Sequence, residues 1–355
     1  MFTNIETKII SLNINGQQVS TKEGSTVLEA AKEAGIYIPT LCYHPSLKPY
    51  GGCRLCIVEI EGMRGFPTSC TTPATDGMVV RTKSEQLEAL RKGIFELIVT
   101  EHPMQCLTCA KNLRCELQEV ASYIGLDNIS LPPTYKGLLI LEDSPFFDRD
   151  YNLCILCGRC IRVCQEIRGA GAIAFTYRGT QTLVSTAFGK PLLDSGCQSC
   201  GACVDICPTG ALMERYSKWL GLPERTVTTT CTYCGVGCQL NLETKGGKII
   251  RVAPAPELEN SPNHGQACVK GRFGVAEFVH HPERLTEPLI RKNGVLVESS
   301  WDEALDLIAQ KFVAYRGDQF AFISSSRCTN EENYLAQKFT RAVMGTNNVD
   351  NCARL

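Results

Sequence analysis

The sequence predicts an α+β protein of several domains, and three of its features support this prediction. The chain has 355 residues, the length of two to four ordinary domains. Its apolar residues repeat with the period of a strand in some segments and of a helix in others. Its 21 cysteines occur in separate groups, most of them two residues from a neighbour. We therefore expect small domains, each built around its own cysteine group.

The cysteine spacing favours thiolates that hold metal over disulfides. Cysteines two residues apart pair poorly with each other. Residues 1–10 lack the basic stretch and apolar core of an export signal, and no apolar run has the ~18 residues needed to cross a bilayer. A net charge of −1 gives no indication of nucleic acid or an anionic membrane as a partner. We expect a cytoplasmic protein with reduced cysteines.

Residues 1–80 predict a ferredoxin-like domain of the β-grasp type. A strand pattern over residues 8–14 runs into the hairpin signal Asn15-Gly16. A helix capped by Ser25 or Thr26 follows, then a cysteine-rich loop and a strand over 57–60. Its cysteine spacing, C-x10-C-x2-C-x13-C, favours a [2Fe–2S] cluster. The alternative, a structural zinc site, usually has two short knuckles where this group has one. The expected ligands are Cys42, Cys53, Cys56 and Cys70.

Residues 81–145 predict a helix followed by a loop-rich segment with a second metal group. Ser84 caps the helix, and its expected buried stripe is Leu87, Leu90, Ile94, Leu97 and Ile98. The spacing H-x3-C-x2-C-x5-C places a histidine before three cysteines that lack a fourth thiolate. Imidazole can replace a thiolate on iron, so we expect a [4Fe–4S] cluster, with Cys3His zinc as the alternative. The expected ligands are His102, Cys106, Cys109 and Cys115.

Residues 146–218 contain the same cysteine run twice, which is typical of a bacterial 2[4Fe–4S] ferredoxin. In the pattern C-x2-C-x2-C-x3-C, the fourth cysteine of each run binds the cluster of the other run. One cluster therefore takes Cys154, Cys157, Cys160 and Cys207. The other takes Cys197, Cys200, Cys203 and Cys164. Residues 172–193 predict a β-hairpin insertion between the runs, and residues 219–225 predict a linker.

Residues 226–285 predict a further cluster domain, and residues 286–355 the beginning of an α/β domain. The fifth group has the spacing C-x2-C-x3-C-x29-C, for which a zinc ribbon is a serious alternative. Its ligands would be Cys231, Cys234, Cys238 and Cys268. Farther on, Ser300 and Glu303 form a capping-box pattern, residues 320–324 predict a buried strand, and Asn330 can cap a helix over 331–344. Cys328 and Cys352 lack partners and are expected to be free, buried thiols.

The chain resembles two known families along its length. Residues 1–215, with all sixteen ligands in that part, resemble the electron-transfer module of the largest peripheral-arm subunit of complex I and of modular [FeFe] hydrogenases. From residue 231 on, the chain resembles molybdopterin oxidoreductases of the cytosolic formate dehydrogenase type. This second resemblance rests on the stretches Cys231-Thr-Tyr-Cys-Gly-Val-Gly-Cys238, Cys268-Val-Lys-Gly-Arg272, Ser325-Ser-Arg-Cys-Thr-Asn-Glu-Glu-Asn333 and Gly345-Thr-Asn-Asn-Val-Asp350.

The second resemblance implies a bis-molybdopterin guanine dinucleotide with Mo or W in the full-length protein, and oxidation of formate to CO2 or the reverse. It implies that Lys270 aids electron passage between the fifth cluster and the pterin, and that Arg327, Asn330 and Glu331 bind the cofactor. In selenium-dependent members the residue after Leu355 would be selenocysteine. We therefore expect that the sequence ends here because UGA was read as stop, and that this piece lacks a complete active site.

Two functions remain open from the sequence. The first is the electron-transfer part of a formate dehydrogenase, with flavin- and NAD(P)-handling subunits, a ferredoxin or a hydrogenase module as partner. The second is a non-catalytic electron-wire subunit of a complex I-like NADH dehydrogenase or hydrogenase complex. The motif from Arg327 onward favours the first, because a wire has no need of a pterin-binding loop. No cysteine pattern beyond Cys207 suits the H-cluster of a hydrogenase subunit.

Overall fold

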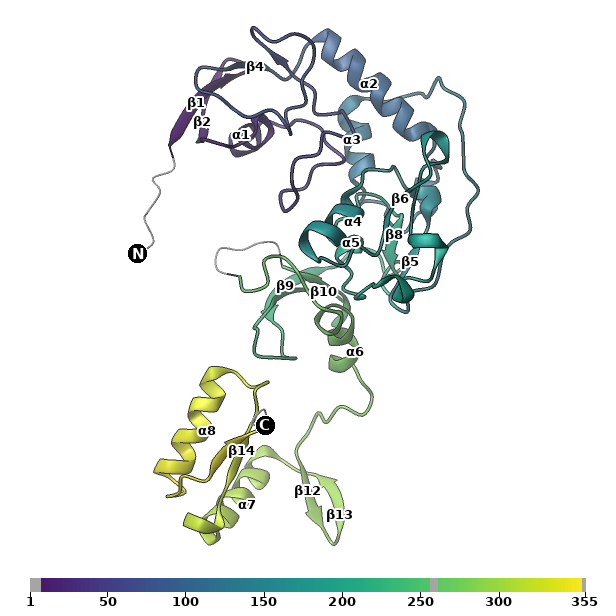
Figure 1. Cartoon of the computed structure of the whole chain (residues 1–355). Coiled ribbons are helices and arrows are strands. Elements are labelled where there is room, and N and C mark those ends of the chain that lie inside the picture. The colour runs from purple at the N-terminus through teal and green to yellow at the C-terminus, as the bar shows by residue number, and fades with distance from the viewer. Residues whose placement is uncertain (1–7, 256–260, 353–355) are drawn as a thin grey trace. The chain divides into compact units, whose positions relative to one another are not determined.

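The computed structural model describes residues 8–255 and 261–352, which divide into two compact units (Figure 1). The first unit extends to Gly221 and the second begins at Leu222, inside the predicted linker. Within the described residues, no helix is both long and apolar enough to cross a membrane. Both units mix short strands and helices, so the predicted α+β class is confirmed.

A four-stranded sheet opens the first unit, in the order β2-β1-β4-β3. β1 pairs antiparallel with β2 and parallel with β4, and β3 pairs antiparallel with β4. The predicted hairpin is confirmed, since Asn15 and Gly16 have φ of 55° and 88°, as a type I′ turn requires. The elements are β1 (Ile9–Ile14), β2 (Gln17–Lys22), α1 (Val27–Glu33), β3 (Glu59–Ile60) and β4 (Val79–Arg81).

The core of this domain lies between the sheet and α1. Leu12, Leu28 and Val80 are fully buried in it. Thr26, one of the two predicted caps, begins α1 with a capping box: its side chain accepts from the Glu29 N–H, and the Glu29 carboxylate accepts from the Thr26 N–H at 2.7 Å. Two cysteines of the first metal group, Cys56 and Cys70, are buried in the same core, so that group is built into the fold.

Helix α2 (Glu85–Thr100) begins at Ser84, as predicted, but buries a different face. Its fully buried residues are Leu87, Arg91, Phe95 and Val99. Leu90 and Leu97, expected in the core, are 38% and 65% exposed, and that part of the prediction is wrong. The buried face of α2 is rotated from the predicted one because Arg91 lies at its centre. A pattern of apolar residues cannot reveal a buried arginine.

The remainder of the first unit consists of short elements separated by loops. The predicted hairpin insertion is confirmed by the antiparallel pair β6–β7, and β5 pairs with β8 at the two ends of the cysteine repeat. The elements are η1 (Cys106–Thr108), α3 (Glu116–Ile124), β5 (Phe147–Arg149), η2 (Tyr151–Leu153), α4 (Arg159–Arg162), η3 (Val163–Ile167), β6 (Ala174–Thr176), η4 (Gly179–Gln181), β7 (Leu183–Ser185), η5 (Ala187–Gly189), η6 (Leu193–Ser195), α5 (Ala202–Asp205) and β8 (Leu212–Glu214).

The second unit begins with a three-stranded antiparallel sheet in the order β11-β10-β9. A turn at Gly246 and Gly247 joins β10 to β11, and both glycines have positive φ. Leu240, Val252 and Val275 form the small core under this sheet. The elements are β9 (Arg225–Thr230), β10 (Gln239–Lys245), β11 (Lys248–Pro254), η7 (Lys270–Gly274) and α6 (Val275–Val279).

The end of the second unit corrects three predictions. Ser300 accepts from the Glu303 N–H at 3.1 Å, but the Glu303 carboxylate turns to Ser299, so no capping box forms. Ile323 is 75% exposed on the predicted buried strand, because among the described residues β14 pairs with β15 alone, in a two-stranded sheet. Thr329 caps α8, one residue before Asn330. The elements are β12 (Leu289–Lys292), β13 (Val295–Glu298), α7 (Trp301–Ala314), η8 (Gly317–Gln319), β14 (Phe322–Ser324), α8 (Asn330–Ala342) and β15 (Val349–Asn351).

Candidate iron–sulfur centres

The first cysteine group gathers in the loops between α1 and β4. Its members are Cys42, Cys53, Cys56 and Cys70, of which only Cys53 is not fully buried. The Cys53 N–H donates to Cys42 Sγ at 3.3 Å, and the Gly51 N–H donates to the Cys70 sulfur. The hydrogen bond with Cys53, followed by burial, raises the pKa of Cys42, and the contact with Cys70 followed by burial does the same for Cys56. Four thiolates can therefore share this space only with compensating positive charge, which iron supplies.

Arg91 on α2 supports this loop, although no sequence pattern pointed to it. Its side chain is buried, and it donates to the carbonyls of Leu55 at 3.1 Å, Ile57 at 2.6 Å and Thr82 at 2.8 Å. Two of these carbonyls lie next to Cys56, so the guanidinium fixes the backbone on both sides of a predicted cluster ligand. His44, two residues after Cys42, is half-buried, and burial followed by the nearby Arg159 lowers its pKa to about 4.

The second group follows α2 and ends where α3 begins. Cys115 is the N-cap of α3 and is buried, and burial raises its pKa. It interacts electrostatically with Cys109. His102 is also buried: burial lowers its pKa, the backbone of Leu153 engages its ring, and its Nδ1 has no hydrogen-bond partner among the described residues. The Cys109 N–H donates to the Cys106 carbonyl at 3.2 Å, whereas the described residues show no direct contact of His102 with the three cysteines. A neutral imidazole with a free ring nitrogen nevertheless has the chemistry of a metal ligand.

The third and fourth groups come together across the two cysteine runs. Cys207, from the second run, interacts electrostatically with all three leading cysteines of the first run, Cys154, Cys157 and Cys160. The same four cysteines line one small cavity. Burial, the largest effect, raises the pKa of Cys154 to about 11 and that of Cys157 to about 12, so these sulfurs are neutral thiols near pH 7 without metal.

The fourth group is the counterpart of the third. Cys164, from the first run, interacts with Cys197 and Cys203 of the second. Cys200 interacts with the same two cysteines. Burial raises the pKa of Cys203 above its ordinary range. The structure thus brings the cysteines together in crossed sets of four, in the arrangement that the sequence predicts for cluster binding.

The two runs have the same local backbone. Leu156 and Ser199 have φ of 52° and 50°, and Gly158 and Gly201 have φ of 72° and 73°. The N–H of Leu156 donates to Cys154 Sγ at 3.4 Å, and the N–H of Ser199 donates to Cys197 Sγ at the same distance. Each left-handed glycine directly precedes a short helix, α4 or α5, that carries the third cysteine of its run. These repeated turns present backbone N–H groups to sulfur, which offsets negative charge on a cluster.

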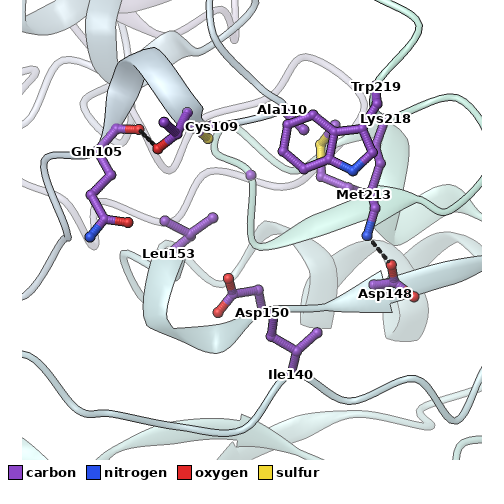
Figure 2. Close-up of a pocket in the computed structure, with 12 residues that line it drawn as sticks. Gln105, Cys109, Ala110, Ile140, Asp148, Asp150, Leu153, Met213, Lys218 and Trp219 are labelled. Atoms are coloured by element: carbon purple, nitrogen blue, oxygen red, sulfur yellow. Dashed lines mark hydrogen bonds and ion pairs between the residues drawn. The ribbon is translucent and has the colours of Figure 1, made fainter.

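A cavity of about 240 Å³ lies where the second group meets the ferredoxin-type repeat (Figure 2). Its lining includes Cys109 from the second group and Leu153, the residue before Cys154. Lys218 points toward Asp148 in Figure 2, and Arg215 also pairs with this carboxylate, at 2.7 Å. Burial alone would raise the pKa of Asp148, but the hydrogen bonds from Lys218 and Arg215 outweigh it and hold the pKa below its usual value.

The fifth group lies in the second unit, around the ends of β9 and β10. The Cys231 N–H donates to the Cys238 carbonyl at 2.8 Å, and Cys238 interacts with Cys231, Cys234 and Cys268. Cys234 and Cys268 are exposed, so this group is more open than the others. Lys270 is exposed, and its neighbour Gly271 lies beside the Cys231 sulfur. In the described part of the chain, no three Cys, His, Asp or Glu side chains, in this group or in any other, converge as the ligands of a single metal ion do.

The loop after β14 lies against the fifth group. A Cβ added to Gly235, next to Cys234, would stand 3.1 Å from the Ser326 carbonyl oxygen. Asn333, which was not singled out as a site residue, holds this loop by donating to the carbonyls of Ser325 at 3.3 Å and Thr329 at 3.0 Å. The three predicted cofactor residues Arg327, Asn330 and Glu331 are exposed on the same loop and the first turn of α8.

The two cysteines outside the groups differ in exposure. Cys328 is half-buried, but Cys352 is exposed, and the prediction that it is buried is wrong. Cys352 follows β15 at the open end of the two-stranded sheet, where nothing described covers it. Its sulfur lies 3.4 Å from Ser325 Oγ, and this hydrogen bond is the main reason why its pKa is lowered.

Profiles of known domains match the chain in sequence order. The first two are a 2Fe-2S iron-sulfur cluster binding domain at residues 7–85 and the NADH-ubiquinone oxidoreductase-G iron-sulfur binding region at 91–130. The ferredoxin-like domain of NADH-quinone oxidoreductase subunit 3 follows at 144–213. The molybdopterin oxidoreductase Fe4S4 domain matches 224–281, and the molybdopterin oxidoreductase domain matches 284–355. The chain has iron–sulfur domains like those of the NADH-quinone oxidoreductases, followed by domains of the molybdopterin oxidoreductase family.

Curated proteins that resemble the chain have different names. The NADPH-Fe(3+) oxidoreductase subunit alpha of Geobacter sulfurreducens is 37% identical over 98% of this chain, and so is the NADH-quinone oxidoreductase G 2 protein of Rhizobium meliloti. YrhE of Bacillus subtilis, whose name assigns it provisionally to the formate dehydrogenases, is 34% identical over 99% of the chain. The chain spans about 40% of the length of each.

A solved structure also matches much of the chain. It is a chain of a NAD+-reducing [NiFe]-hydrogenase in the H2-reduced state, with 33% identity and a TM-score of 0.55. The match covers 60% of this chain and 90% of the hydrogenase chain. The iron–sulfur domains are therefore supported by sequence and by fold, and the molybdopterin type of the later domains is supported by the matching domain profiles.

Proposed function

We propose that the chain is the electron-transfer portion of a formate dehydrogenase and carries five iron–sulfur clusters. The observation that supports this most directly is the crossed grouping of eight cysteines, since a single metal ion has no use for two interleaved sets of four. The clusters would be one [2Fe–2S] on the first group, one [4Fe–4S] on the histidine-bearing group, two on the crossed groups and one on the fifth group. Zinc remains the alternative for the second and fifth groups.

The chain's own residues would hold and insulate these clusters. Buried cysteines become thiolates only when iron replaces their protons, so cluster binding releases protons. His102 would replace one thiolate in the second centre and leave it less negative than its neighbours, which raises its reduction potential. The backbone N–H groups of Leu156 and Ser199 would stabilise the sulfur charge of the two ferredoxin-type centres.

Formate is the substrate that we propose for the full-length protein. The support is the loop with Arg327, Asn330 and Glu331, which lies against the fifth cysteine group, together with the likeness to YrhE. When bound, a molybdopterin guanine dinucleotide with Mo or W would supply two-electron chemistry at a carbon centre. Lys270, exposed next to the fifth group, would aid electron passage between that cofactor and the cluster. The cluster chain then divides the two electrons into single steps.

A metal analysis tests the cluster assignment. Anaerobically purified protein should contain about 18 iron and about as many acid-labile sulfides per chain, and at least about 16 if the two-iron centre is poorly loaded. Zinc at one equivalent or more per chain would show that at least one of the five sites is a zinc site and not an iron–sulfur cluster.

A second assay tests formate. The full-length enzyme, loaded with metal and selenium, should reduce a dye when formate is added. Inactivity in such a preparation would favour the second function, an electron-wire subunit, which the 37% identity to the NADH-quinone oxidoreductase G 2 protein supports.

The partners that we propose follow from this electron path. The match to a chain of a NAD+-reducing hydrogenase supports a flavin- and NAD(P)-handling subunit, and a ferredoxin or a hydrogenase module are the other redox partners proposed. The cytoplasm is the proposed location. Co-purification with native-level expression, followed by mass spectrometry and flavin analysis, tests the partner; a flavin-free homomer that reduces ferredoxin directly would contradict the flavin subunit.

A further inference from the structure

Helix α4 places two buried arginines among the proposed cluster ligands. Arg159 and Arg162 lie on either side of Cys160, between Cys157 and Cys164. Their exposed fractions are 2% and 8%. A guanidinium is charged at every ordinary pH, and burying it is costly unless it is paired. The contacts of these two side chains therefore indicate what they do.

Arg159 connects the ferredoxin-type repeat to the histidine-bearing group. Both of its terminal nitrogens donate to the carboxylate of Glu116, at 2.6 Å and 2.8 Å. Glu116 directly follows Cys115, and its own N–H donates to the carbonyl of Pro208, next to Cys207, at 3.0 Å. A bidentate ion pair and a backbone hydrogen bond thus join the second group to the repeat.

Arg162 makes the equivalent connection to the two-iron group. It donates to the carbonyl of Lys48 at 2.9 Å and to the carbonyl of Cys42, and it stacks over the ring of Tyr50 with 4.6 Å to the ring centre. The second of these carbonyls belongs to a proposed ligand. Among the described residues, the Arg162 guanidinium has no carboxylate partner. Its charge is therefore compensated there only by carbonyl dipoles and by the face of the Tyr50 ring.

In each arginine, the Nε atom takes no part in these contacts. The Nε of Arg159 and the Nε of Arg162 are buried, and neither has a hydrogen-bond partner within the residues that the structure describes. A buried N–H without an acceptor is costly in a native protein. Cluster sulfides and thiolates accept hydrogen bonds, and such bonds and the net charge around a cluster set its potential.

We propose that Arg159 and Arg162 are positioning residues that fix the ferredoxin-type clusters against the two other centres and raise the reduction potentials of those centres. Arg162 acts on the two-iron centre through the Cys42 loop, and Arg159 acts on the histidine-bearing centre through Glu116. This inference rests on the proposed cluster assignment. It adds that the four-residue helix α4 controls the reduction potentials of two neighbouring centres, the two-iron centre and the histidine-bearing centre.

Redox titrations of two variants in the complete protein, followed by low-temperature EPR, test the proposal. Arg162→Met should shift the two-iron equilibrium at least tenfold toward the oxidised form, about 59 mV for a one-electron couple, and leave the histidine-bearing centre within about twofold. Arg159→Met should give the opposite pattern. Each variant thus serves as the control of the other. Unchanged potentials in both variants, or equal shifts at both centres, would overturn the proposal.

Two further variants separate charge from folding. Arg54→Met removes an exposed arginine next to Cys53 and should change no potential, because solvent screens its charge. If Arg162→Met loses iron, Arg162→Gln keeps a donor for the Cys42 carbonyl without the charge. A tenfold shift toward the oxidised form at the two-iron centre of that variant supports the proposal, and an unchanged potential overturns it.

The iron content of the wild-type protein distinguishes the two possible failures. Wild type with zinc in place of iron would refute the cluster assignment itself. If wild type contains about 18 iron but its reduction potentials are the same in both arginine variants, only the role of α4 is refuted.

Discussion

Replacing Arg91 by methionine tests how the fold holds the first cysteine group. The side chain donates three charge-assisted hydrogen bonds to the carbonyls of Leu55, Ile57 and Thr82. Leaving a buried acceptor unpaired costs about 1–3 kcal/mol, and methionine recovers part of the apolar contact. Three carbonyls left unpaired at about 1 kcal/mol each, the lower end of that range, give an expected net loss of about 3 kcal/mol. This is a large share of the ~5–15 kcal/mol that stabilises a typical domain.

The consequence of Arg91→Met should be selective. The Leu55 and Ile57 carbonyls flank Cys56, so the variant should lose the two-iron EPR signal and about two of its iron atoms, while the four-iron signals persist. Lys92→Met is the matched control, because Lys92 is the next residue of α2 and is exposed. A variant with the wild-type two-iron signal and an unchanged melting temperature would refute this reasoning.

Three other predictions follow from the described contacts. The lowered pKa of Asp148 means that its ion pairs stabilise the fold above pH ~4 and that this stability is lost as the pH falls through the folded pKa; Asp148→Asn should flatten the acid side of a melting temperature–pH curve. The double variant Cys154→Ala/Cys207→Ala should lose about four iron atoms, and Cys154→Ala/Cys164→Ala about eight, whereas ligation by consecutive cysteines would reverse the two results. Thr329→Ala should lower the stability of the second unit by about 1 kcal/mol in chemical denaturation, since it removes the cap of α8; an unchanged midpoint would contradict the capping box.

Local signals in the sequence predicted much of the fold. The Asn15-Gly16 turn and the caps Ser84 and Thr26 need only their own neighbours to form, and all three are confirmed. Long-range packing accounts for the errors. Leu90 is 38% exposed because α2 turns Arg91 toward the carbonyls of Leu55, Ile57 and Thr82, which lie outside the named strands, and no periodicity reports where such acceptors lie.

The candidate site divides in the same way. Cysteine spacing predicted the crossed groups that the structure brings together, because a cluster would constrain the short loops between its ligands. It could not identify Arg159 or Arg162, whose roles depend on partners more than 40 and more than 110 residues away in the sequence. Charged residues between cysteines are ordinary surface residues on composition alone, and only the fold shows that these two are buried.

The crossed arrangement of the cysteine runs has a consequence for biogenesis. The set with Cys154 is complete only when Cys207, the last of the eight along the chain, has been synthesised. The set with Cys164 is complete only after Cys203. While the ribosome is still making the hairpin β6–β7, neither site has four thiols. Iron delivered that early would find only partial sites, so maturation of this domain should follow translation of both runs. The cell can then hold the thiols reduced and load both clusters in one late step.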